Sequence, residues 1–240
     1  MNTYTQALDF YKSHHIANQK AHVADNKFST GSNIKRLEQI KRLTPLLEDN
    51  FNFEVINCVE TGGSHKWNDG KVGIYFAYLS TITGGKFSSV DIDPNIADKV
   101  IESYTNLHLN HTHYINDSIE FLKNLDYIPN LVHLDSWDVN LKDPLPSALH
   151  GWREFEAIED KMPIGSIIVI DDNWYEGNWI EWLMVDKSEG DKEILSREII
   201  DITYPCIGKG AHIYQWIKSG NSNWKILDAD YKLVIQKING

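Results

Sequence analysis

The chain contains 240 residues, enough for a single α/β domain with a well-buried core. Its 34 acidic and 23 basic side chains leave a net charge of −11, which repels nucleic acids and anionic membranes, so the expected partner is a small molecule. Cys58 and Cys206 are too few for a disulfide framework. Together with the lack of a signal peptide or a membrane-length apolar run, they predict a reducing, cytoplasmic location.

Residues 1–50 are predicted to form an N-terminal helical cap. Tyr4, Leu8 and Tyr11 fall on one face of a first amphipathic helix, and residues 34–47 carry the apolar face of a second. Capping residues at Ser32-Asn33 are expected to start the second helix. Little in this range points to chemistry.

A strand, a glycine loop and a helix follow. The apolar run 55–59 leads into the loop 60–64, and residues 72–79 have the length and composition of a buried helix. A second strand, residues 87–93, carries Asp91 near its end. Ligands of open α/β sheets lie beyond the carboxyl ends of the strands, where Asp91 could accept hydrogen bonds from both hydroxyls of a ribose. The loop lacks the GxGxxG fingerprint of dinucleotide sites, which favours a ligand with a ribose and no phosphate.

The pattern Glu60-x-Gly62, followed by Val-Asp-Ile-Asp-Pro at residues 90–94, resembles motifs I and II of class I S-adenosylmethionine-dependent methyltransferases. The resemblance covers nearly all of residues 53–237, with its motifs in the family's order. It implies a Rossmann-like fold and S-adenosylmethionine as the cofactor. An ordinary βαβ unit with a tight turn would also explain the glycine pattern. The implied cofactor-binding residues in this part of the chain are Glu60, Gly62, Gly63, Ser64, Asp91 and Ile92.

A third strand ends at Asp117-Ser118, after a predicted helix over residues 95–107. In the resembled family such a pair lies at the adenine edge of the cofactor. The same side chains are good caps for the helix that follows, because Asp and Ser accept hydrogen bonds from free backbone N–H groups. The two roles are compatible.

Two further strands end in oxygen-bearing side chains. One ends at Asp135, and the β-branched run 167–170 ends in Asp171-Asp172-Asn173. Neighbouring strand ends would present these hard oxygen ligands to one spot, which suits Mg²⁺. The pattern resembles the metal-dependent O-methyltransferases typified by catechol O-methyltransferase. That match implies Asp135, Asp172 and Asn173 as metal ligands, with Asp135 also near the cofactor; Asp171 could compete as a ligand.

The base that takes the proton is less clearly marked. In the catechol family a lysine shortly after the first metal-binding Asp acts as the base, but the corresponding residue here is Asp138. Asp138, His150 or a metal-bound hydroxide could take the proton, because a base needs reach more than a particular identity. The missing lysine also leaves open a protein that binds the cofactor without catalysis.

The rest of the chain predicts ordinary elements. Residues 147–161 have a helical pattern with Ser147 as its cap. Residues 174–205 carry the least regular pattern, with a cluster of aromatic side chains that could form a substrate wall. Gly208-Lys209-Gly210 lacks the longer P-loop pattern and predicts a turn and a helix cap. A further helix and two closing strands are expected at residues 211–218, 224–228 and 231–237.

These elements predict a single α/β domain over residues 51–240, following the helical cap: a Rossmann-like, seven-stranded, mostly parallel sheet with an antiparallel last strand. The first functional hypothesis is a Mg²⁺-assisted, S-adenosylmethionine-dependent O-methyltransferase acting on a small-molecule hydroxyl in a vicinal diol, a catechol or a sugar. The alternatives are a metal-independent small-molecule N- or O-methyltransferase and a catalytically silent S-adenosylmethionine-binding protein. No nucleic-acid or membrane partner is expected, and a homo-oligomer is compatible with the sequence.

Overall fold

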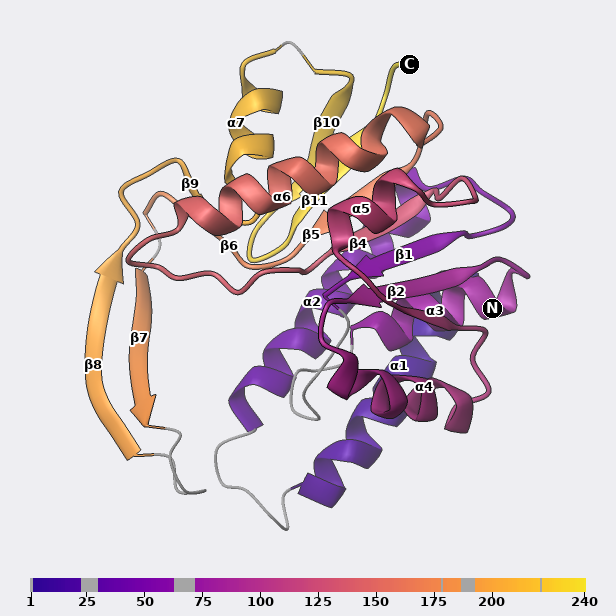
Figure 1. Cartoon of the computed structure of the whole chain (residues 1–240), viewed down its shortest axis with the longest axis horizontal. Coiled ribbons are helices and arrows are strands. Elements are labelled where there is room, and N and C mark those ends of the chain that lie inside the picture. The colour runs from indigo at the N-terminus through magenta and orange to yellow at the C-terminus, as the bar shows by residue number, and fades with distance from the viewer. Residues whose placement is uncertain (1, 23–29, 63–71, 178, 187–192, 221) are drawn as a thin grey trace.

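A seven-stranded sheet forms the centre of the computed structural model (Figure 1), which describes residues 2–22, 30–62, 72–177, 179–186, 193–220 and 222–240. Six strands run parallel, and β11 is antiparallel to both of its neighbours. This topology confirms the predicted sheet, including its antiparallel last strand. In spatial order the strands are β10 (Trp224–Ala229), β11 (Leu233–Lys237), β5 (Ile167–Ile170), β4 (Leu131–Leu134), β1 (Cys58–Thr61), β2 (Phe87–Asp91) and β3 (Thr112–Ile115).

Helices cover both faces of the sheet. One hydrophobic cluster joins the sheet to α1 (Thr3–His22), α2 (Thr30–Asn50), α3 (Gly73–Ile82) and α4 (Ala97–Asn106). A second cluster joins the opposite face to α5 (Ser118–Lys123), α6 (Leu145–Ile158) and α7 (Ala211–Lys218). Short 3₁₀ turns, η1 (Pro94–Ile96) and η2 (Glu159–Lys161), precede α4 and follow α6. The chain therefore forms a three-layer α/β sandwich.

The central strand β5 shows how the sequence produces this double burial. Ile167 and Val169 belong to the first cluster, whereas Ile168 and Ile170 belong to the second. Successive side chains of a strand point to opposite faces, and all four of these are 0% exposed. A continuous β-branched run is therefore what a strand covered by helices on both sides requires.

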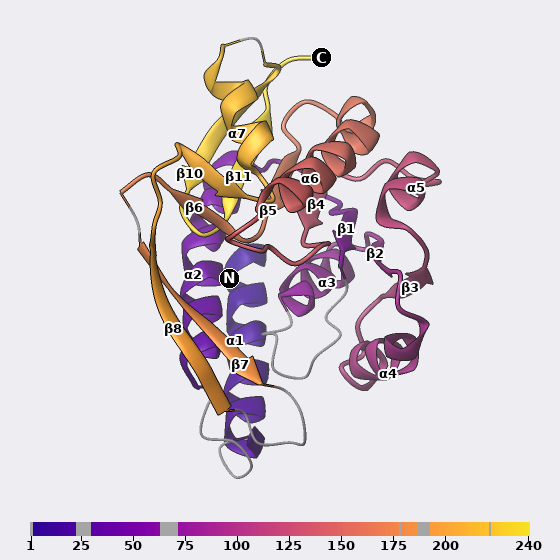
Figure 2. The ribbon, with the colours of Figure 1, turned by 60° about the vertical axis from the view of Figure 1, so that its left-hand side comes forward.

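The two N-terminal helices lie side by side (Figure 2) and pack against the body of the domain. Tyr11 of α1 and Leu47 of α2 are buried in the cluster that contains the strand side chains. The guanidinium of Arg42 also binds Asp228 and Asp230, at 2.6 and 2.5 Å. Both predicted helices are confirmed, but the predicted cap of the second is wrong, because α2 begins at Thr30 and Ser32-Asn33 lie inside it. The residues before and after position 50 share one hydrophobic core, and the division at residue 50 stays a prediction.

The region that the sequence predicts to be irregular, residues 174–205, contains paired strands. A short pair is formed by β6 (Asn173–Tyr175) and β9 (Cys206–Gly208). A longer hairpin, β7 (Trp179–Asp186) and β8 (Glu193–Asp201), extends away from the central sheet in Figure 1. The prediction of irregular structure is therefore wrong for most of this range. Residues 187–192, which follow β7 in the sequence, lie outside the described residues.

The predicted cap of α6 is also wrong. The helix begins at Leu145, so Ser147 lies inside it. Its Oγ donates a hydrogen bond to the carbonyl of Pro144 (2.9 Å), whereas an N-cap side chain would accept one from a backbone N–H. Pro144 at the N-cap and Pro146 in the first turn start this helix, because proline fixes a helical φ where the missing N–H has no partner to lose.

Both cysteines, Cys58 and Cys206, are buried and free of disulfide bonds. Among the described residues, no helix has both the length and the apolar character that crossing a membrane requires.

Candidate active site

The carboxyl ends of three neighbouring parallel strands lie side by side and form one edge of the sheet, the carboxyl-terminal edge. β1 pairs in parallel with β2 on one side and with β4 on the other. Gly62 follows β1, Asp91 ends β2 and Asp135 follows β4. This edge is where ligands of open α/β sheets bind. The structure therefore brings together one predicted site residue from each of the three strands.

Gly62 holds the loop after β1 against the end of β4. Its φ of +70° lies in the left-handed region, and its N–H donates a hydrogen bond to the Val90 carbonyl (3.0 Å). A Cβ here would lie 2.4 Å from the carbonyl oxygen of Asp135, so conformation and contact both require glycine. Gly63 and Ser64, the next predicted cofactor contacts, lie outside the described residues.

Asp91 and Ile92 stand at the end of β2. Asp91 is half-buried, and its Oδ1 accepts a hydrogen bond from the backbone N–H of Asp93 (2.8 Å). The side chain of Ile92 is 72% exposed. Their roles in cofactor binding stay predictions.

Asp117 and Ser118 begin α5, as the sequence predicts. An oxygen of Asp117 accepts a hydrogen bond from the Glu120 N–H (3.0 Å), which confirms its capping role. The hydroxyl of Ser118 lies 3.1 Å from Nε2 of His150. Whether this pair also contacts a cofactor stays a prediction.

The two candidate bases occupy different surroundings. Asp138 is exposed. His150 is largely buried, because its ring stacks on Trp137 with 5.3 Å between the ring centroids. Trp137 itself is 58% exposed and adopts a φ of +66°. His150 therefore lies beside Ser118, at the start of α5. The catalytic roles of Asp138 and His150 stay predictions.

Asp135 and Asp172 lie close together, as expected for residues after neighbouring strands, with the ammonium of Lys209 between them. Its Nζ lies 2.5 Å from Oδ1 of Asp135 and 2.9 Å from Oδ2 of Asp172. The Lys209 side chain is 2% exposed. Burial lowers the pKa of this ammonium, but attraction to the two carboxylates outweighs burial and raises the pKa above its ordinary value. Lys209 is therefore a buried cation.

Asp135 has an unusual protonation equilibrium. Burial raises the pKa of its carboxyl to about 7, although the positive charge of Lys209 opposes this shift. The side chain keeps 21% of its surface exposed. A half-buried carboxyl with a pKa near neutrality is typical of catalytic sites.

Both polar atoms of the Asn173 side-chain amide form hydrogen bonds with the backbone. Its Nδ2 donates hydrogen bonds to the carbonyls of Ile170 (2.9 Å) and Asp171 (3.0 Å). Its Oδ1 accepts one from the N–H of Gly210 (2.7 Å). Asn173 is 1% exposed, so its contacts assign it to the folding of this loop.

A second set of charged groups lies beneath the same edge, on the face covered by α3. Nδ1 of His133 lies 3.0 Å from Oε1 of Glu60, the predicted cofactor contact. Lys232 lies 2.8 Å from Oδ1 of Asp171 and 3.4 Å from Nε2 of His133. Burial raises the pKa of Glu60 and lowers the pKa of His133, which favours the neutral form of each.

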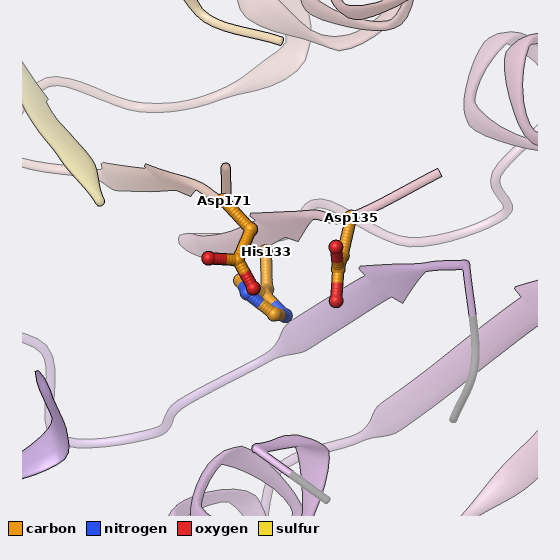
Figure 3. A group of neighbouring side chains, drawn as sticks. All are labelled: His133, Asp135 and Asp171. Atoms are coloured by element: carbon orange, nitrogen blue, oxygen red, sulfur yellow. The ribbon is translucent and has the colours of Figure 1, made fainter. Parts of the chain in front are cut away.

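Figure 3 shows His133, Asp135 and Asp171 pointing to the same side of the strand ends. One ligand atom from each lies within 4.8 Å of the others, so their spacing alone would suit a metal ion. Both of these carboxylates, however, already contact an ammonium group, Asp171 that of Lys232 and Asp135 that of Lys209. A divalent cation beside either ammonium would be repelled.

The predicted Mg²⁺ ligands face the same obstacle. The Lys209 ammonium contacts both Asp135 and Asp172, and the oxygen of Asn173 accepts a backbone hydrogen bond. Mg²⁺ prefers six oxygen ligands in near-ideal octahedral geometry. In this arrangement the three predicted ligands do not fit the ion.

Sequence reasoning missed the two lysines that complete the site. Lys209 stands in a Gly-Lys-Gly stretch that predicts a turn, and Lys232 immediately precedes β11. The sequence does indicate that such lysines are needed, because several acidic side chains at adjacent strand ends require counter-ions. That requirement does not say which lysine, among residues far apart in the chain, supplies the charge.

No protein-family model and no curated protein sequence matches the chain. Solved structures do resemble it. An S-adenosylmethionine-dependent methyltransferase from Clostridium acetobutylicum ATCC 824 has 13% identity and a TM-score of 0.52, over 94% of this chain and 100% of that one. A putative rRNA methylase from Clostridium thermocellum has 13% identity and a TM-score of 0.50, over 84% and 97%.

NSun6 from Pyrococcus horikoshii, solved with SFG, has 11% identity and a TM-score of 0.52, over 82% of this chain and 50% of that one. At such identities the similarity concerns the fold. The seven-stranded, mostly parallel sheet with its antiparallel β11 is consistent with this fold. The chain therefore has the fold of the class I S-adenosylmethionine-dependent methyltransferases.

Proposed function

We propose that the protein is an S-adenosylmethionine-dependent methyltransferase that acts on a hydroxyl group of a small molecule. The observation that supports this most directly is the meeting of Gly62, Asp91 and Asp135 at the ends of three adjacent strands. Gly62 allows the loop after β1 to pack against the end of β4, and Asp91 offers an acceptor for ribose hydroxyls. This is the arrangement that a nucleoside ligand without a pyrophosphate requires.

The charge of the site also suits a sulfonium cofactor. Four carboxyl groups, those of Glu60, Asp135, Asp171 and Asp172, are connected through His133 and through two lysines among the described residues. Burial favours the neutral form of Glu60. With the other three ionised, three negative and two positive charges leave an excess of one negative charge. Such a site attracts a cationic ligand in a region of low dielectric.

The net charge of −11 supports a small-molecule acceptor. One structurally similar protein is described as a putative rRNA methylase, but a strongly acidic chain would be repelled by the phosphates of RNA. A homo-oligomer and a cytoplasmic location are compatible with this proposal.

The reaction would be an in-line displacement. The acceptor oxygen attacks the methyl carbon, the carbon–sulfur bond breaks, S-adenosylhomocysteine leaves with the sulfur lone pair, and the hydroxyl proton passes to a protein base. Asp138 and His150 remain candidates for that base. Asp135 joins them, because a pKa of about 7 is near the optimum for proton transfer at neutral pH. Alignment of the two reactants would supply most of the acceleration.

A Mg²⁺-assisted form of this reaction would require Asp135, Asp172 and Asn173 to hold the ion and would add polarisation of the acceptor hydroxyl. The contacts of Lys209 and Asn173 favour the metal-independent form instead. In that form the carboxylates at the strand ends would contact the acceptor or the cofactor directly.

A calorimetric titration with S-adenosylmethionine tests the proposal. Asp91→Ala should weaken binding by about 10- to 100-fold, because hydrogen bonds to a charged group contribute about 1.5–3 kcal/mol. Asp98→Ala, at an exposed acid in the first turn of α4, is the matched control and should bind like wild type. Wild-type protein that binds no cofactor would refute the proposal.

A turnover assay distinguishes an active methyltransferase from a catalytically silent S-adenosylmethionine-binding protein. Production of S-adenosylhomocysteine should be followed with a panel of diols, catechols and sugars, in the presence of EDTA and of Mg²⁺. Acceptor-dependent turnover in EDTA supports the metal-independent enzyme. Cofactor binding without turnover across the panel would favour a catalytically silent binding protein.

A further inference from the structure

Lys209 satisfies the two carboxylates that a metal ion would need. Its Nζ donates hydrogen bonds to Oδ1 (2.5 Å) and to the backbone carbonyl (3.0 Å) of Asp135, and it forms an ion pair with Oδ2 of Asp172 at 2.9 Å. An ammonium group has three donors, and two of them bind Asp135. The cation therefore contacts both carboxylates at this one edge of the sheet.

The backbone on both sides of Lys209 passes close to the end of β5, which places the ammonium beside Asp135 and Asp172. Gly208 has a φ of +122°, and a Cβ there would lie 1.9 Å from the carbonyl oxygen of Asp172. A Cβ at Gly210 would lie 2.8 Å from Oδ1 of Asn173. Both flanking glycines are therefore required for the chain to pass this close to the end of β5.

The opposite side of Lys209 is equally close to its neighbour. A Cβ on Gly151 of α6 would lie 2.3 Å from the Lys209 carbonyl oxygen. The segment is thus held between α6 and the end of β5. Moving the ammonium away to admit another cation would require displacing this packed backbone or leaving two largely buried carboxylates without this counter-ion.

We infer that the ammonium of Lys209 takes the place of a divalent cation at this strand edge, holding Asp135 and Asp172 together so that the site functions without a metal. Lys209 is then a positioning residue, because it fixes the two carboxylates. The inference deepens the proposed function, on which its meaning for catalysis depends. The exclusion of metal is a property of the apoprotein and is testable without cofactor.

Mn²⁺ is the probe, followed by its electron paramagnetic resonance signal and by calorimetry, with no S-adenosylmethionine present. Wild type is expected to bind no Mn²⁺ at the strand edge. Lys209→Ala removes the positive charge and opens space between two carboxylates, so it should bind one Mn²⁺ at least roughly tenfold more tightly than wild type. Adding Asp172→Asn to Lys209→Ala should abolish that gain.

Two variants control for charge and for burial. Lys209→Arg keeps a cation beside the carboxylates and should bind no Mn²⁺. Lys237→Ala removes another buried lysine, 6% exposed, whose Nζ donates to the Glu159 carbonyl (2.8 Å), and should gain no site. Circular dichroism confirms that each variant is folded.

A folded Lys209→Ala protein that binds Mn²⁺ no better than wild type would overturn the inference. Wild-type Mn²⁺ binding that Asp172→Asn abolishes would overturn it as well, and this measurement decides the question even if Lys209→Ala does not fold. Because no cofactor is added, either result is distinct from a failure of the proposed methyltransferase function, which would appear as a loss of S-adenosylmethionine binding.

Discussion

At the scale of single residues, Gly62 and Gly84 offer a matched pair. Both have a φ near +70°, but a Cβ at Gly62 would meet the Asp135 carbonyl at 2.4 Å, whereas a Cβ at Gly84 meets nothing within 4 Å. Gly84→Ala should therefore lower the free energy of unfolding by about 1–2 kcal/mol, the cost of a left-handed alanine. Gly62→Ala adds overpacking and should lower it by about 2–5 kcal/mol.

The affinity for S-adenosylmethionine should also differ between Gly62→Ala and Gly84→Ala. Gly62→Ala displaces the loop at the proposed site and should weaken S-adenosylmethionine binding, whereas Gly84→Ala should leave the dissociation constant unchanged. Urea unfolding and calorimetry provide the two measurements. Equal effects of both substitutions on stability and on affinity would show that the contact with Asp135 has no importance.

The strand-end residues of the candidate site could be predicted from sequence, and their partners could not. Asp135 and Asp172 follow apolar runs that identify themselves as strands, so parallel pairing places them together. Lys209 approaches from 74 residues beyond Asp135, through a Gly-Lys-Gly segment whose local pattern predicts only a turn. Such a contact depends on how α6 and the end of β5 pack, which no local pattern encodes.

At the scale of elements, the pairing of β2 with β3 contains a histidine network that should respond to acid. Ser89 Oγ lies 2.8 Å from Nε2 of His111 and 2.8 Å from Nδ1 of His113. Burial lowers the pKa of His111 to about 3. The unfolded chain, with an ordinary histidine pKa of about 6.5, therefore binds a proton that the folded chain does not, so stability is present above pH 6.5 and falls as the pH drops below it.

Between pH 7 and pH 5 this single group should reduce the free energy of unfolding by about 1–2 kcal/mol. Urea unfolding at both pH values measures the loss, and His111→Gln should show a loss smaller by that amount. His108→Asn is the control, since His108 is exposed and asparagine tolerates its φ of +55°. An unchanged pH dependence in His111→Gln would contradict the assignment.

The strands differ in how clearly their sequences predict them. The β5 run Ile167–Ile170 is apolar at every position, a pattern that identifies a strand buried on both faces. The apolar residues of β7 and β8 are interrupted by charged and polar residues such as Glu181, Ser196 and Arg197. Among the described residues these two strands pair with each other and not with the central sheet, so no strand of that sheet fixes their register.

At the scale of the whole molecule, α1 and α2 should unfold together with the sheet. Leu47 of α2 is 0% exposed and belongs to the cluster that contains Cys58 and Val169 of the strands. Removing its side chain leaves a cavity in that shared core, so Leu47→Ala should lower the free energy of unfolding by about 2–5 kcal/mol. Ile101→Ala, at a residue 45% exposed on α4, should change it by less than about 0.5 kcal/mol.

Calorimetry distinguishes a shared core from a separable cap. If residues 1–50 fold with the rest of the chain, Leu47→Ala shifts one transition whose calorimetric and van't Hoff enthalpies agree. If they form an independent unit, the variant loses an early transition and leaves the later one in place. The buried positions of Tyr11 and Leu47, and the ion pairs of Arg42 with Asp228 and Asp230, favour the single transition. In that case the N-terminal helices cannot open as a lid without exposing the core that supports β1.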